Sequence, residues 1–291
     1  MRVLGWLKII LVLVVDFFLI NGLLGPELAL AITAGLLLYA GWLGEWLGLL
    51  QDGAIRLEKL GSMERSRLLE ARASLAEDVQ RTCKADLSRV RFYVIPSSNE
   101  INAFSYGSKI AVTRAALQAC DDGTLLAVLG HEASHHLHGD APFHRLLFAN
   151  ATLLLAGISI GSFVAISFLW IVFLVLCVAG VCGGLCSAFL FRGANSLIKG
   201  FFTGLQHVLV FIYQSFMGLV SRRCEYRADR FSSKLGYGPQ LCYFLSRFVQ
   251  GQDESRKRSF SELLYASHPA TEKRLARIER AIEQGQLIMQ K

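Results

Sequence analysis

The longest apolar stretch of the sequence covers residues 146–191, where 46 residues in succession include no charged side chain and no histidine. A helix of roughly 20 apolar residues crosses a bilayer, so this block is long enough for two spans and a tight turn. Two more apolar segments, residues 3–24 and 28–50, lie on either side of a Gly-Pro-Glu break at residues 25–27. We therefore expect a multi-pass membrane protein with about four transmembrane helices.

An alternative for the first segment is a cleaved signal peptide, because Ala29-Leu30-Ala31 resembles a cleavage site. The apolar run continues past Ala31 without a polar start, which favours a hairpin of two spans over residues 1–50. Asp16 lies inside the first span, where an acidic group is costly and is a candidate functional group. An aspartate at the interface, or paired within the bundle, is the plainer interpretation.

The composition agrees with a membrane protein: 53% of the residues are hydrophobic and 18% are charged, against roughly 25% charged in an average soluble domain. The net charge is +7, and the basic residues cluster at residues 56–91, 192–234 and 247–280. Such clusters beside membrane spans usually mark the cytoplasmic face. We expect a protein of a bacterial-type inner (plasma) membrane, with its active site in the cytoplasm. No nucleic-acid motif is present, so we expect no nucleic-acid partner.

Residues 52–145 are more polar and are predicted to form a mixed region of helix and strand. Residues 56–89 have the composition of a polar helix, rich in Glu, Arg, Leu and Ala. Three short β segments are predicted after it, at residues 91–96, 101–106 and 110–113. A second helix is predicted over residues 124–138, with Asp121 or Asp122 near its N-cap and Gly139 at its end.

This second helix contains His-Glu-Ala-Ser-His at residues 131–135, which is the H-E-x-x-H pattern of zinc-dependent hydrolases. Positions i and i+4 of a helix point in the same direction, so His131 and His135 can bind one metal ion. Glu132 is then placed to take a proton from a metal-bound water. Two histidines leave zinc short of a third protein ligand, which another part of the sequence must supply.

We do not expect the third ligand on the same helix. His138 shares the helix face but is seven residues from His131, about 10 Å along the axis, and His136 points off the face. Glu225 is the better candidate, and Asp229 on the same face is placed to hydrogen-bond a ligand histidine. Alone, the E-x-x-x-D pattern is weak because it usually marks a solvated helix face; it gains weight from the H-E-x-x-H upstream.

Residues 131–140 (H-E-A-S-H-H-L-H-G-D) and 221–229 (S-R-R-C-E-Y-R-A-D) resemble motifs of the HtpX-type integral-membrane zinc metalloproteases. That family is related to the CAAX-processing endoproteases. Residues 101–104, followed by residues 110–112, resemble the family's segment before the zinc helix. Residues 267–274, which contain Ser-His-Pro, a glutamate and an arginine, resemble its C-terminal motif. The resemblance covers most of the chain, in order.

The resemblance implies a mainly α-helical membrane protein, in which about four transmembrane helices accompany an α+β, gluzincin-like zinc protease domain with a small antiparallel sheet. It implies one zinc ion per chain, with His131, His135 and Glu225 as ligands. Glu132 is implied as the general base, and Asp229 as the carboxylate that orients a ligand histidine.

The same resemblance implies roles for residues on either side of this cluster. Asn102, Ala103 and Phe104 are expected on an edge strand that binds substrate by backbone pairing. His268 is a candidate donor to the oxyanion, and a loop residue before proline is an equal alternative. His207 matches no motif and is expected to be a packed or interfacial histidine.

All metal ligands must lie on one side of the membrane, so an even number of crossings must separate the zinc helix from the Glu225 segment. We expect an N-terminal hairpin (1–50), a first protease segment (51–145), a transmembrane hairpin (146–191) and a second protease segment (192–291). Residues 197–220 are then expected at the membrane surface or partly inside it. In the alternative, residues 146–191 make one crossing plus a re-entrant part.

We therefore expect a membrane-embedded zinc endopeptidase that cleaves misfolded or membrane-associated proteins at the cytoplasmic face, as in protein quality control. Its partners are expected to be protein or peptide substrates and the lipid bilayer. Two alternatives stay open: a non-catalytic zinc-binding membrane adaptor, and a zinc hydrolase of a non-peptide substrate.

Overall fold

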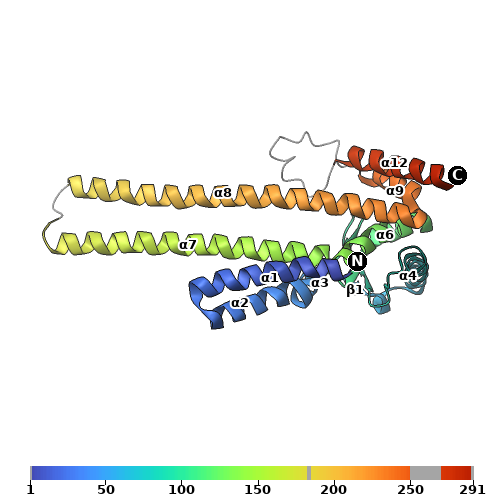
Figure 1. Cartoon of the computed structure of the whole chain (residues 1–291), viewed down its shortest axis with the longest axis horizontal. Helices are drawn as coiled ribbons and strands as arrows, with labels where there is room; N and C mark the ends of the chain where they lie inside the picture. The colour runs from blue at the N-terminus through green and yellow to red at the C-terminus, as the bar shows by residue number, and fades with distance from the viewer. Residues whose placement is uncertain (1, 182–184, 250–269, 290–291) are drawn as a thin grey trace. The chain divides into compact units, whose positions relative to one another are not determined.

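The computed structural model describes residues 2–181, 185–249 and 270–289. The chain divides into two compact units, one formed by Met1–Leu146 with Met217–Lys291, and the other by Leu147–Phe216. Figure 1 shows the elements of both units in chain order. Among the described residues, four helical segments are long and apolar enough to cross a membrane, as the sequence predicts.

The first two of these segments form the N-terminal hairpin of the larger unit (Figure 1). Helix α1 (Arg2–Leu24) packs against α2 (Pro26–Leu38), and Gly25 joins them with a φ of 86°. This backbone conformation is open to glycine and strained for residues with a side chain. Most large apolar side chains of α1 are exposed, as expected for helices that face lipid.

The second segment is kinked where it approaches the polar region. A π-helical turn (Tyr39–Leu43) joins α2 to α3 (Gly44–Gln51), and Gly41 in this turn has non-helical dihedral angles. Arg145 donates hydrogen bonds to the carbonyl oxygen of Ala40 at 2.7 and 3.0 Å. A broken helix leaves carbonyl groups that lipid cannot satisfy, and this guanidinium supplies the missing donors.

The smaller unit contains most of α7 (Asp140–Val178) and much of α8 (Leu185–Ser232), which pack against each other (Figure 1). Phe191 of α8 stacks on Phe173 of α7 with ring centroids 4.3 Å apart. Gln206 donates to the hydroxyl of Ser159 at 2.9 Å. Two long helices therefore separate the helix with the H-E-x-x-H pattern from the Glu225 segment.

These helices correct the predicted boundaries. The expected hairpin within residues 146–191 and the separate surface helix at residues 197–220 are both wrong, because residues 185–232 form one continuous helix. No proline interrupts this stretch, and the isolated Lys199 is compatible with a helix. Before the turn, Gly180 adopts a φ of 74°.

A four-stranded sheet in the larger unit has the order β1-β2-β4-β3. Its strands are β1 (Ile55–Arg56), β2 (Arg91–Ile95), β3 (Ala103–Ser105) and β4 (Lys109–Thr113). The sheet is mixed rather than antiparallel, because β2 and β4 are parallel. Strand β3 lies at the edge of the sheet, and β4 lies between β3 and β2. Because β4 is antiparallel to β3, it runs in the same direction as β2.

The core of the larger unit lies among the sheet, α4 (Ser62–Cys83), α6 (Asp122–His138) and the helices after α8. In α4 the buried residues recur at helical spacing, which gives one apolar stripe. After α8 the chain forms a π-helical turn, α9 (Gly238–Phe244), a second π-helical turn (Leu245–Val249) and, after residues 250–269, α12 (Thr271–Met289). This arrangement places α6, α8 and α12 around one cavity.

Candidate active site

Helix α6 has the two end signals that the sequence predicts. Asp121 is the N-cap, and its carboxylate accepts a hydrogen bond from the backbone N–H of Thr124 at 2.7 Å. Gly139 ends the helix with a left-handed φ of 63°. Twelve of the 17 residues of α6 are buried, His131 among them, which fixes the helix against the core.

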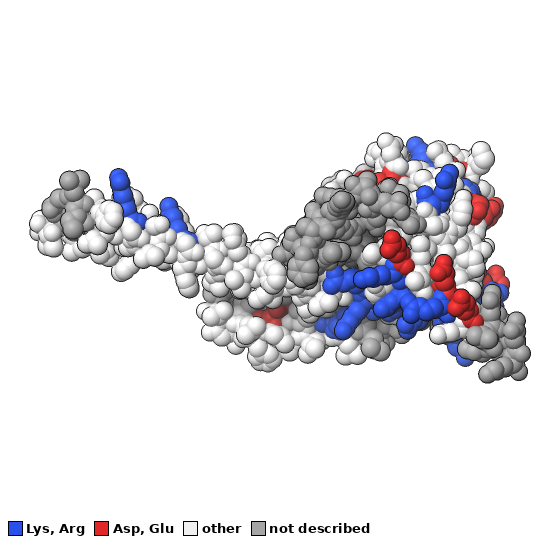
Figure 2. Space-filling view, turned by 90° about the horizontal axis from the view of Figure 1, so that it is seen from above, with Lys and Arg blue, Asp and Glu red and all other residues white. Residues whose placement is uncertain are grey.

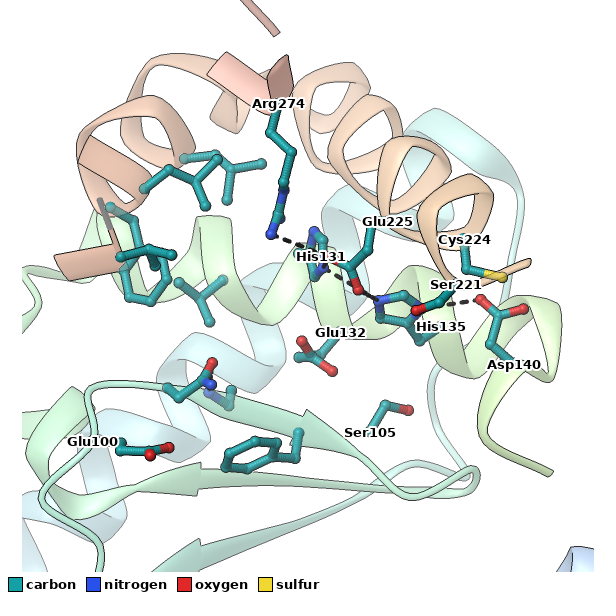
Figure 3. A pocket seen from close by; sticks show the side chains of 18 of the residues that line it. Glu100, Ser105, His131, Glu132, His135, Asp140, Ser221, Cys224, Glu225 and Arg274 are labelled. Carbon is teal, nitrogen blue, oxygen red and sulfur yellow. Dashed lines mark hydrogen bonds and ion pairs between the residues drawn. The ribbon is translucent and has the colours of Figure 1, made fainter. Parts of the chain in front are cut away.

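The structure brings His131, His135 and Glu225 together, although Glu225 lies on α8 (Figure 3). The two Nε2 atoms are 3.2 Å apart, and the Glu225 carboxylate oxygens lie 3.4 Å from Nε2 of His131 and 3.5 Å from Nε2 of His135. Zinc–ligand bonds of about 2.0–2.1 Å at tetrahedral angles separate neighbouring donor atoms by about 3.3 Å. The three donors therefore fit a single tetrahedral metal ion.

Each imidazole contacts a carboxylate through its other ring nitrogen. Nδ1 of His131 lies 3.0 Å from Asp229, the partner expected from the sequence, and Nδ1 of His135 lies 3.0 Å from Asp140. An ionised carboxylate can only accept, so each Nδ1 carries the proton. In the neutral form of each imidazole, Nε2 is then the nitrogen without a proton and is available as a ligand.

The electrostatics of the cluster favour a cation. Burial lowers the pKa of His131, but Asp229 and Glu225 outweigh it and raise the pKa overall. Burial also lowers the pKa of His135, but the carboxylates of Asp140 and Glu225 outweigh this effect and raise the pKa to about 10. Carboxylates thus stabilise positive charge where the two imidazoles meet Glu225. A divalent cation supplies such charge while the imidazoles stay neutral.

Each carboxylate that contacts a histidine Nδ1 is also paired with an arginine. Arg274 of α12 donates to both oxygens of Asp229 at 2.7 and 2.9 Å, and its Nη1 lies 3.1 Å from Glu225. Arg227 of α8 contacts both oxygens of Asp140 at 2.6 Å. Bidentate guanidinium–carboxylate pairs hold the acceptor in a defined orientation.

Asp140 has a further partner in the first membrane helix: Lys8 of α1 lies 3.1 Å from its carboxylate and also 4.5 Å from the ring centre of Phe143. The sequence alone predicts no role for Asp140, Arg227 or Lys8, and Arg274 stands out there only as part of a motif. The charged Lys8 inside an apolar span was the available signal, because such groups usually have a partner.

Glu132 lies in a cavity of 590 Å³, between the imidazoles and the strand that carries Ser105 (Figure 3). The predicted substrate residues Asn102, Ala103 and Phe104 line the same cavity. Strand β3 is at the edge of the sheet and, among the described residues, pairs with β4 on one side only. The cavity therefore has the predicted ligands on one wall and a strand edge on another.

Of the five remaining histidines, His144 of α7 lines the same cavity as His131 and His135. The other four do not line it or lie outside the described residues. His136 is buried and contacts the carbonyl oxygen of Gly107, while Nδ1 of His138 contacts the carbonyl oxygen of Ser134 at 2.8 Å. Neither joins the cluster, as the helix geometry predicts. His207 lies in the smaller unit. His268 lies outside the described residues.

The family of the chain follows from comparison with known proteins. The chain belongs to peptidase family M48, whose model matches residues 70–282. Protease HtpX of Shewanella sp. (strain MR-4) is 28% identical over 230 residues, covering 70% of this chain and 72% of that protein. Protease HtpX of Idiomarina loihiensis is 26% identical over 259 residues, covering 82% and 80%.

The crystal structure of S. mikatae Ste24p is similar with a TM-score of 0.51 and 19% identity. The match covers 91% of this chain, which spans 61% of the length of that one. At this identity the similarity concerns the fold. The resemblance stated from the sequence is confirmed, and the chain is a multi-pass membrane protein of a protease family.

Proposed function

We propose that the protein is a zinc-dependent endopeptidase that cleaves misfolded or membrane-associated proteins at the cytoplasmic face of the membrane. The observation that carries the proposal is the set of donor distances of 3.2, 3.4 and 3.5 Å among His131, His135 and Glu225. These residues would hold one zinc ion. Asp229 and Asp140 would keep the Nδ1 protons in place and so present both Nε2 atoms to the metal.

Glu132 would act as the general base. It is one residue beyond a ligand, is 8% exposed, and has its carboxylate inside the cavity (Figure 3). There it would accept a proton from the attacking water and pass it to the leaving amine. Zinc bound in such a site acts as a Lewis acid and lowers the pKa of a water ligand toward about 7.

The edge of β3 supports a peptide substrate. Asn102 exchanges hydrogen bonds with Thr113 and Tyr106 donates to Lys109, so the even-numbered residues of this segment face β4. Backbone groups alternate in direction along a strand, which turns those of Ala103 and Ser105 toward the free edge. The N–H of Ala103 already donates to Oδ1 of Asn102 at 2.9 Å. An extended substrate would therefore pair with the carbonyl oxygen of Ala103 and with Ser105, in a refinement of the expected 102–104 set.

The membrane setting supports the substrate class. The candidate ligands lie in the same compact unit as the N-terminal membrane hairpin, to which Lys8 connects them. Proteins embedded in or close to the bilayer are the substrates most able to reach such a site. The clusters of Lys and Arg support a cytoplasmic orientation. The names of the HtpX relatives agree with proteolysis.

The test is cleavage of casein and of an unfolded membrane protein by the purified full chain, with a chelator and zinc add-back. Glu132→Gln should keep its zinc and lose about 100- to 10,000-fold in cleavage rate. Glu100→Gln is a matched control, because Glu100 also lines the cavity but is not near the imidazoles (Figure 3). Cleavage by Glu132→Gln at the wild-type rate would contradict the proposal.

The same experiment separates the two alternatives. A non-catalytic zinc-binding adaptor would contain zinc but cleave neither protein in any preparation. A hydrolase of non-peptide substrates would leave both proteins intact and cleave small esters or amides in a Glu132-dependent manner.

A further inference from the structure

A second, smaller cavity lies on the outer side of α12 and shares no lining residue with the cavity of the candidate metal site. It has a volume of 310 Å³ and is lined by Tyr226 of α8 and by five residues of α12, namely Glu272, Lys273, Ala276, Arg277 and Arg280. Lys273, Arg277 and Arg280 are spaced four and three residues apart, so they share a helix face. Three cations and one carboxylate give this small cavity a net positive charge.

Helix α8 extends the positive surface. Arg222, Arg223 and Arg230 are three or four residues from Tyr226 and are its neighbours on the helix surface. The guanidinium of Arg277 lies 3.8 Å from the ring centre of Tyr226, which joins the two helices at this point. We call Arg222, Arg223, Arg230, Lys273, Arg277 and Arg280 the basic patch. Figure 2 shows Lys and Arg side chains gathered over α12 and the end of α8, with acidic residues beside them.

The position of this patch along α8 relates it to the membrane. Between Lys199 and Arg222, 22 successive residues are uncharged. At 1.5 Å per residue they extend about 33 Å, close to the roughly 30 Å thickness of the bilayer hydrocarbon. Arg222 then lies at the end of the hydrocarbon, and Tyr226 about 6 Å further along the axis. The headgroup layer on each side is about 5–8 Å thick.

The cavity at Tyr226 is therefore level with the lipid phosphates. Tyrosine is enriched at this depth, and arginine donates to phosphate oxygens in bidentate fashion. We propose that the basic patch and its cavity bind the headgroup of an anionic phospholipid. The occupant is a lipid because the site lies where the headgroups are. A soluble phosphate would need no such position.

Helix α12 contributes a buried arginine to one site and exposed cations to the other. Arg274 points inward to Asp229 and Glu225, whereas its neighbours in the patch point outward. The headgroup site is distinct from the metal cluster, and its occupancy is measurable without any peptidase assay.

The experiment uses the full chain in nanodiscs of phosphatidylcholine, alone or with phosphatidylglycerol at roughly one part in five. Native mass spectrometry after release from the discs counts the phosphatidylglycerol molecules that stay bound. The test variant is K273Q/R277Q/R280Q, and the matched control is R65Q/R89Q/R91Q, which removes three exposed cations outside the patch. Wild type and control should retain phosphatidylglycerol in preference to phosphatidylcholine, and the test variant should lose about tenfold or more of that preference.

Three results would overturn the proposal: an unchanged preference in the test variant, an equal loss in the control, or equal occupancy of the site in phosphatidylcholine discs by millimolar inorganic phosphate or glycerol phosphate. The first would exclude the patch, the second would indicate a diffuse charge effect, and the third a site for free anions. If the triple variant does not fold, R280E alone, at an exposed position, should lower the preference in the same direction.

Discussion

At the residue scale, Asp140 shows how one carboxylate can organise a site. It accepts from Nδ1 of His135, pairs with Arg227 and contacts Lys8, and it is 2% exposed. A buried aspartate surrounded by two cations stays ionised, which keeps the imidazole in the tautomer that a metal requires. Asp140 is therefore expected to set the metal affinity of His135 without contacting the metal.

Replacing Asp140 with asparagine tests this expectation. The amide keeps the size of the side chain but removes its charge, so we predict that zinc affinity falls about 10- to 100-fold. A competition titration with a chromophoric chelator measures the affinity. Asp86→Asn, at an exposed position, is the control and should leave it unchanged. An Asp140→Asn protein with wild-type zinc affinity would remove Asp140 from the account.

The sequence predicts which candidate ligands the structure brings together, and predicts their partners only in part. His131 and His135 follow from helix periodicity, which is local, and the Glu225–Asp229 spacing is local as well. The contact of Arg227 with Asp140 joins residues 87 positions apart, and that of Lys8 joins residues 132 apart. No local pattern contains such pairs, so they become visible only in the folded chain.

At the element scale, features set by interactions between residues close in sequence are predicted better than features set by distant residues. Helix α6 ends where expected and begins at Asp122, two residues before the expected start, because Asp121 and Gly139 act within a few residues. The strand order is decided by pairing between distant segments, so the parallel pair of β2 and β4 was not foreseen. The extent of α8 was missed for another reason, since an apolar run without proline contains no local end signal.

We expect the contact between Lys8 and Asp140 to hold helix α1 against the start of α7. Replacing Lys8 with methionine removes the positive charge of Lys8 next to Asp140. Asp140 then still has Arg227 as a partner. We predict a loss of about 1 kcal/mol in stability, less than for a buried pair left with no counter-ion. Thermal unfolding in detergent measures it, with Lys8→Arg as the control that keeps the charge. Equal melting temperatures for wild type and Lys8→Met would show that the contact contributes nothing.

At the scale of the whole molecule, the central constraint is the return of the chain to the side of the membrane it left. The zinc helix precedes α7, Glu225 lies near the end of α8, and the donor atoms of the two segments are within 3.5 Å. Each of α7 and α8 includes a candidate span, so two candidate spans lie between the candidate ligands. This number is even, as expected, although α7 and α8 do not follow the expected boundaries.

Single cysteines introduced into a cysteine-free background test this topology. Residues 65 and 283 are exposed in the larger unit, and residue 181 is exposed at the turn after α7. We predict that an impermeant maleimide labels positions 65 and 283 from the cytoplasmic side and position 181 from the opposite side. Labelling of positions 65 and 283 from different sides would be incompatible with a shared metal site.

The most direct measurement of the central claim is the zinc content of the purified chain and of two variants. Wild type and Glu132→Gln should each contain one zinc ion per chain, because we propose Glu132 as a base and not as a ligand. Glu225→Ala should lose most of its zinc while remaining folded by circular dichroism. A full complement of zinc in Glu225→Ala would contradict the account, because α8 would then supply no ligand to the metal held by α6.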